Sequence, residues 1–179
     1  MGEDQAGQIN AVGYELYLEL LNDAVLTARG ESTDAGVEPE INVRIPALIP
    51  DSFIPDLRIR LAYYKALTNI QTPDDLDRIE AELRDQYGKL PEQVLNLMGL
   101  MLIRAVCKDL CVRDLSSGES SVTLAFTEKT PLPVDRVIEL ASRSNKKYSI
   151  TPDNRLRVRI NEVTWPRIHD ELMYLKSLI

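Results

Sequence analysis

Hydrophobic residues repeat at two different spacings along this chain, and the spacing changes near residue 112. Before that point they recur every three or four positions, which is typical of helices with one buried face. We predict helices over residues 14–29, 56–69 and 73–87, and a fourth that begins near Pro91. The fourth is apolar on most sides, so we expect it to be the central buried helix.

Two of these helices have a well-defined predicted face. The signals at the ends of the 73–87 helix are also clear: Thr72 is suited to the N-cap, Pro73 to the first position and Gly88 to the C-terminal stop. The residues expected to point inward are Leu57, Leu61, Tyr64 and Leu67 or Thr68 in the 56–69 helix, and Leu76, Ile79, Leu83 and Tyr87 in the 73–87 helix.

The other segments indicate strands and stiff connections. Ile41, Val43 and Ile45 alternate with polar residues and predict a half-buried strand, and three prolines in residues 46–55 then predict an irregular connection. After residue 112 the period is two. It predicts a hairpin in "CVRDLSSGESSVTLAFT", closed by Ser-Gly, and another in "KYSITPDNRLRVRI", closed by "PDN".

A short helix in "PVDRVIELASRS" separates the two hairpins, and a terminal helix is predicted over residues 165–179. The predicted order of helices and strands contains no regular βαβ repeats. We therefore predict an α+β fold in which helices pack with a small, mainly antiparallel sheet, preceded by an N-terminal helix and a linker.

Composition is that of an ordinary globular protein, with 44% hydrophobic and 27% charged residues among 179. The net charge of −7 is unevenly placed: residues 1–40 hold nine acidic and one basic residue, whereas residues 91–179 hold eleven acidic and thirteen basic residues. This balance does not favour general nucleic-acid binding. Two cysteines and the absence of a signal peptide or an apolar span predict a cytoplasmic protein without membrane contact.

Residues suited to catalysis are scarce. His169 is the sole histidine, so a serine or cysteine nucleophile has only one imidazole available as a base. Cys107 and Cys111 stand four apart on one predicted helical face, which supplies half of a metal site; two buried thiols are the favoured interpretation. Nucleotide-binding and zinc-protease motifs are absent. We expect no catalytic site, cofactor or metal in this chain.

An acidic cluster lies on the 73–87 helix, opposite the apolar stripe. Asp74, Glu82 and Asp85 share that side, with Arg78 beside them. Carboxylates on a rigid helix suit docking onto arginines of another domain. The alternative is a solvated face with weak pairing between Arg78 and Glu82.

A basic cluster lies in residues 143–159. Arg155, Arg157 and Arg159 alternate, so they share one face of a strand and are suited to phosphate contact. The alternative is a charged solvent face or a protected edge strand. The cluster comprises Arg143, Lys146, Lys147, Arg155, Arg157 and Arg159.

Three stretches together resemble the carboxy-terminal end of the bacterial transcription-repair coupling factors (the Mfd family): "GEDQAGQINAVGYELYLELLNDAV", "IPALIPDSFIPDLRIRLAYYKAL" and "IEAELRDQYGKLPEQVLNLM". The resemblance runs from Gly2 to the end of the chain and is weakest in the linker and after residue 112. In that family "GEDQAG" is the last part of a translocation motif of the second helicase lobe. Gln5 and Gly7 match it, and Ala6 replaces its usual serine.

The resemblance implies a fragment organised as three segments. Residues 1–29 are the tail of the translocation motif and the helix that follows it, residues 30–40 are a linker, and residues 41–179 are a regulatory domain. The Walker motifs, the RNA polymerase-binding module and the UvrA-binding module all belong to parts of the family outside this chain.

The function implied is regulatory. Proteins of this family displace RNA polymerase stalled at DNA lesions by ATP-driven translocation, and they recruit UvrA for nucleotide excision repair. Their carboxy-terminal domain clamps the UvrA-binding module in the resting protein and restrains the motor. An acidic residue of the "AELRDQYG" helix takes part in that contact. Glu82 is the matching position, and Asp85 and Arg78 lie beside it.

The partner implied for this chain is therefore the UvrA-binding module of the same parent chain. The parent's own partners are DNA, RNA polymerase and UvrA, and its cofactors are ATP and Mg²⁺. Two alternatives stay open: a nucleic-acid-binding module that uses the basic strand around Arg155–Arg159, and an enzyme with an unrecognised site.

Overall fold

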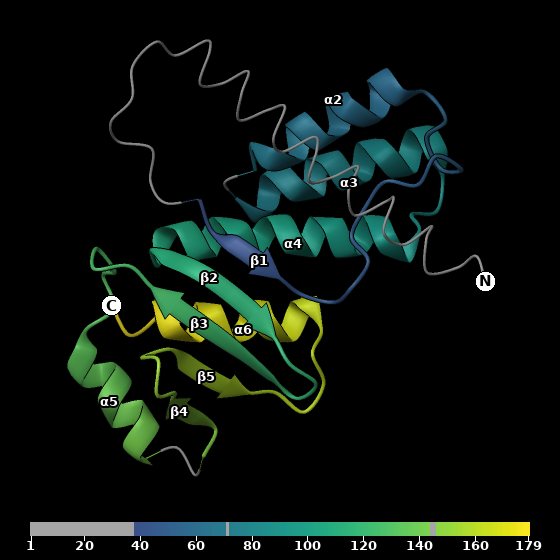
Figure 1. Ribbon diagram of the computed structural model, residues 1–179. Coiled ribbons are helices and arrows are strands. Elements are labelled where there is room, and N and C mark those ends of the chain that lie inside the picture. The colour runs from purple at the N-terminus through teal and green to yellow at the C-terminus, as the bar shows by residue number, and fades with distance from the viewer. Residues whose placement is uncertain (1–37, 71, 144–145) are drawn as a thin grey trace. The chain divides into compact units, whose positions relative to one another are not determined.

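The computed structural model describes residues 38–70, 72–143 and 146–179 (Figure 1). The predicted helix over residues 14–29, Gln5, Gly7 and most of the predicted linker lie outside these residues. The elements, in chain order, are β1 (Glu40–Asn42), α2 (Leu57–Thr68), α3 (Pro73–Tyr87), α4 (Glu92–Asp109), β2 (Val112–Ser117), β3 (Ser121–Phe126), α5 (Val134–Arg143), β4 (Tyr148–Ile150), β5 (Leu156–Arg159) and α6 (Trp165–Lys176).

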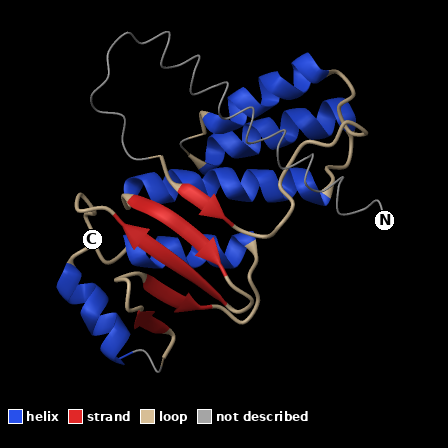
Figure 2. Cartoon of the chain, in the orientation of Figure 1, coloured by secondary structure: helices blue, strands red, loops and turns tan. Residues whose placement is uncertain are grey.

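The strands form one five-stranded sheet in the order β1-β2-β3-β5-β4 (Figure 2). β1 runs parallel to β2, and the other neighbours are antiparallel. Both predicted hairpins are present: β2 and β3 are joined through Gly118, and β4 and β5 through residues 151–155. The predicted α+β class with a mainly antiparallel sheet is thus confirmed.

The chain divides into two compact units. Of the described residues, the first unit holds 46–101 and the second holds 38–45 and 102–179, so the division falls inside α4. The predicted domain of residues 41–179 spans both units. None of the described helices, α4 included, is long and apolar enough to cross a membrane.

In the first unit, α2 buries only part of its predicted face: Tyr64 and Leu67 lie inward as predicted, and two leucines do not. Tyr63, Tyr64 and Leu67 are buried, whereas Leu57 is 59% exposed and Leu61 36% exposed. The prediction for the two leucines is wrong because both tyrosine hydroxyls have specific partners. The backbone N–H of Ile49 donates to Tyr64 at 2.8 Å, and Tyr63 donates to α3. These bonds hold both tyrosines inward. The spacing predicts this for Tyr64 but not for Tyr63, whose partner lies on another helix.

The buried face of α3 matches its prediction closely. Leu76, Ile79 and Leu83 are buried, and Tyr87 is half-buried. The Tyr87 ring lies 5.6 Å from Phe53 and 6.3 Å from Tyr63 between centroids, so it completes a small aromatic cluster.

In the second unit the sheet has one apolar and one polar face. α6 covers the apolar face with Trp165, Ile168, Leu172 and Leu175 (Figure 1). The opposite face carries hydroxyl and basic side chains. β1 is shorter than predicted and ends at Asn42, because the Arg44 N–H donates to the side chain of Ser117, at 3.4 Å, rather than to strand backbone.

Candidate functional site

Both ends of α3 are held by local bonds, so the helix that carries the acidic cluster is well defined. Thr72 is the N-cap, as predicted, and it forms a capping box with Asp75. The Asp75 N–H donates to the Thr72 hydroxyl at 3.3 Å, and the Thr72 N–H donates to the Asp75 carboxylate at 3.2 Å. At the other end Gly88 adopts φ 82°, a conformation that favours glycine.

The predicted acidic cluster lies on the exposed side of α3. Asp74, Glu82 and Asp85 are all exposed. Arg78 pairs with Asp75 at 3.1 Å instead of with Glu82, and Glu80 pairs with Arg84 at 2.7 Å. In the part of the chain that the structure describes, Asp74, Glu82 and Asp85 form no ion pair, so their negative charges are not neutralised locally.

Glu82 is positioned by an uncharged donor. The Tyr63 hydroxyl donates to its carboxylate at 2.9 Å, and Gln86 donates to the same oxygen at 3.4 Å. Burial, together with the hydrogen bond and negative charge of Glu82, raises the pKa of Tyr63 well above its usual value of 10. Tyr63 therefore stays protonated and keeps donating to the Glu82 carboxylate.

A surface groove of ≈ 600 Å³ lies between α2 and α3 beside this carboxylate. Its floor includes Ile59, which is 41% exposed, and Ile79, and its rim carries Arg58 and Glu82. A carboxylate next to exposed apolar surface fits a guanidinium head and its aliphatic stem. The sequence pattern indicates neither Tyr63 nor this groove, because both depend on how α2 packs against α3.

The arginines of the predicted basic cluster differ in whether they pair with an acidic residue. Arg155 pairs with Asp114 at 2.6 Å and with Asp153 at 2.8 Å, so two acids of its own unit offset its charge. Arg157 and Arg159 are exposed on β5. The edge-strand interpretation is wrong, because β5 lies between β3 and β4, and the edge strands of the sheet are β1 and β4.

The structure separates the two cysteines. Cys107 is fully buried in α4, where burial raises the pKa of its thiol to about 12. Cys111 follows the end of α4 with φ 53°, so the prediction of one shared helical face is wrong. His169 is half-buried on α6. Across residues 38–70, 72–143 and 146–179, no group of three or more His, Cys, Asp and Glu residues is arranged to hold a metal ion.

Comparisons with known proteins converge on one family. Residues 43–137 match the family described as the TRCF domain. The transcription-repair-coupling factor of Myxococcus xanthus is 33% identical over 159 residues, which cover 89% of this chain and 13% of that protein. The factor of Escherichia coli K12 is 32% identical over 167 residues, which cover 88% of this chain and 14% of that protein.

Structural similarity agrees with the sequence matches. The crystal structure of the C-terminal domain of a transcription-repair coupling factor superimposes with a TM-score of 0.68 at 22% identity, covering 82% of this chain and 95% of that domain. The chain therefore has the fold of that domain, and it spans only 13% to 14% of the length of the two relatives.

Proposed function

This chain belongs to the transcription-repair coupling factor family, and from that premise we propose that it is an autoinhibitory regulatory domain that clamps the UvrA-binding module of its parent protein. The parent is, in this proposal, an ATP- and Mg²⁺-dependent DNA translocase that displaces stalled RNA polymerase and recruits UvrA. The chain itself performs no catalysis. Its role is to hide the UvrA-binding surface and restrain the motor until the parent engages its target.

The observation that carries the proposal is the state of Glu82. Its carboxylate is exposed and held by the Tyr63 hydroxyl at 2.9 Å, and it has no ion pair among the described residues. Glu82 lies on the rim of the groove between α2 and α3. A carboxylate held in place in this way can accept an arginine from a partner without first losing conformational entropy.

Asp85 extends the contact by one turn along the same helix. Each exposed carboxylate–arginine pair contributes only about 0.2–1 kcal/mol, so two pairs alone make a weak contact. Burial of the exposed apolar floor, including Ile59, adds to it. A total coupling of about 1–3 kcal/mol is suited to a clamp that a ligand can open.

The test is charge reversal at Glu82 and Asp85 in the full-length parent. We expect Glu82→Arg plus Asp85→Arg to raise the affinity for UvrA by about 5- to 150-fold if the coupling is of the size given above, and to raise the basal ATPase rate as well. Asp77→Arg is a matched control, because Asp77 is an exposed acid of α3 that does not line the groove. It should change neither readout.

A second variant tests whether the position of the Glu82 carboxylate matters in addition to its negative charge. Tyr63→Phe removes the hydroxyl that holds Glu82 but keeps the negative charge, so it should open the clamp less than the reversal does. If the reversal variant stays folded and alters neither ATPase nor UvrA binding, the acidic cluster is a solvated face and the proposal fails.

A further inference from the structure

The second unit contains a hollow lined by positive charge. It has a volume of ≈ 630 Å³ and lies beside the polar face of the sheet and the end of α5. Of its eleven lining residues, five are basic, four are serines and none is acidic. The basic residues are Arg143, Lys146, Lys147, Arg157 and Arg159.

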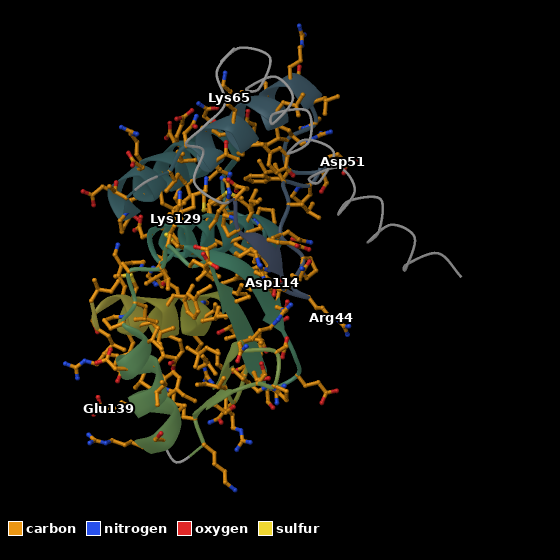
Figure 3. The ribbon with its side chains drawn as sticks, turned by 60° about the vertical axis from the view of Figure 1, so that its left-hand side comes forward. Arg44, Asp51, Lys65, Asp114, Lys129 and Glu139 are labelled. Atoms are coloured by element: carbon orange, nitrogen blue, oxygen red, sulfur yellow. The ribbon has the colours of Figure 1, made fainter. Side chains whose placement is uncertain are left out.

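Two of these cations are already paired with acids of the same unit. Arg143 lies 2.5 Å from Glu139, which Figure 3 labels on α5, and Lys147 lies 2.6 Å from Glu171. Exposed pairs of this kind are weak and can exchange partners. These two residues alone therefore do not indicate a ligand.

The other three cations, Lys146, Arg157 and Arg159, have no acidic partner among the described residues. The strand neighbours of Arg157 are Thr123 and Ser149, and that of Arg159 is Ser121, so their direct cross-strand neighbours are uncharged hydroxyl residues. Like charges on one hollow repel each other, and an anion bound there relieves the repulsion. The chain is acidic overall, with a net charge of −7, so composition does not account for this local excess.

We propose that this hollow binds the phosphate backbone of duplex nucleic acid. Guanidinium, ammonium and hydroxyl groups are the donors that proteins direct at phosphate oxygens, and the hollow offers all three. Single-stranded nucleic acid is bound largely by stacking on exposed aromatic rings. The aromatic residue of the lining, Tyr148, is only 4% exposed and donates to Glu171 at 2.6 Å, so it offers no such surface.

An acidic protein segment is the competing occupant. Protein contacts depend on apolar or aromatic anchors in desolvated pockets. Here serines make up most of the uncharged lining, and the one large ring is buried. The chemistry of the hollow therefore favours phosphates over a peptide.

The test uses the 179-residue chain and a fluorescein-labelled 20-base-pair DNA duplex, followed by anisotropy over a series of NaCl concentrations. Contact with two or three phosphates predicts a slope of log K against log salt of about −2 to −3. We expect Arg157→Ala plus Arg159→Ala to weaken binding at least about tenfold at low salt and to reduce the slope by about 2.

The matched control is Arg44→Ala plus Arg113→Ala. Both arginines are exposed residues of the same unit and line no part of the hollow, so the variant loses the same charge. It should bind the duplex as the wild type does. If the Arg157 and Arg159 variant does not fold, Lys146→Ala, in the loop before β4, should weaken binding on the order of threefold.

Four outcomes overturn the proposal: no binding at the lowest salt, equal loss in the control and test variants, a preference for a single strand over the duplex, or competition by polyglutamate as strong as that by unlabelled duplex at equal charge. The last outcome makes the hollow a docking surface for an acidic protein.

Discussion

Glu82 differs from Asp75 and Glu80, two other carboxylates of α3, in the kind of side chain that contacts it. Asp75 and Glu80 are paired with arginines of their own helix, which offsets their charge. Glu82 is held by a tyrosine hydroxyl, which fixes its position and leaves its negative charge intact. The distinction explains why one residue of a charged helix is suited to recognition while its neighbours stabilise the helix.

Cys107 gives a prediction about one side chain. Because burial raises the pKa of its thiol to about 12, almost no thiolate forms at pH 8. We expect iodoacetamide at pH 8 to leave Cys107 unmodified in the native chain and to modify it once urea unfolds the protein. Mass spectrometry of the peptide that contains Cys107 is the measurement, and rapid modification in the native state would show that α4 opens readily.

Helix ends in this chain are defined by local chemistry. In α2, Asp56 accepts from the N–H groups of Arg58 and Ile59 at 2.8 and 3.3 Å. In α3, the cap Thr72 lies only three residues from Asp75, its partner in the capping box. Bonds over such short separations are present in the sequence pattern itself, which is why the start of α3 is predicted correctly.

The described helices include two with a threonine N-cap, which allows a matched comparison. Thr72 accepts from the Asp75 N–H, whereas Thr164, at the start of α6, makes no side-chain capping bond. We expect Thr72→Ala to lower the free energy of unfolding by about 1 kcal/mol and Thr164→Ala by less than about 0.5 kcal/mol. Urea unfolding monitored by circular dichroism is the measurement. Equal losses would mean that the capping box contributes nothing specific.

At the scale of the whole chain, ion pairs connect segments that are far apart in sequence. Glu38 contacts Arg104 and Lys108 of α4, the latter at 2.8 Å, across 66 residues or more. Burial alone would raise the pKa of Glu38, but hydrogen bonds and charge from the two cations outweigh it and hold the pKa below its usual 4.5.

A pH-dependent stability follows from the sign of that shift. A carboxylate whose pKa is depressed by folding contributes stability above its unfolded-state pKa and loses it as the pH falls through the folded-state pKa. We expect Glu38→Gln to cost about 0.5–1 kcal/mol at pH 7, because its side chain is 45% exposed. The difference from wild type should be smaller at pH 3 than at pH 7, because Glu38 becomes protonated as the pH falls through its depressed pKa.

Urea unfolding at both pH values measures this, with Glu40→Gln as the control. Glu40 is exposed on β1 and forms no ion pair among the described residues. At pH 7, Glu40→Gln should lower the free energy of unfolding less than Glu38→Gln does. A cost of Glu38→Gln that is the same at pH 3 and pH 7 would show that the carboxylate acts by packing and not by charge.

The sequence by itself determined the α+β class, the type of each described element and the start of α3. Each of these features depends on residues within one or two turns of each other. The spacing of apolar residues and the capping residues at helix ends therefore indicate it directly. The acidic face of α3 was predictable for the same reason, because residues three, four and seven apart share a side of any helix.

Only the tertiary structure decided which charges are available. Arg155 is paired with Asp114, 41 residues away, as well as with its neighbour Asp153, while Arg157 and Arg159 have no acidic partner among the described residues, and the spacing of the chain does not indicate the bond to Asp114. Likewise Tyr63 lies 19 residues from Glu82, and their bond both positions the carboxylate and holds inward a tyrosine outside the predicted face of α2. Partners at such separations are chosen by packing, which the spacing of residues along the chain does not contain.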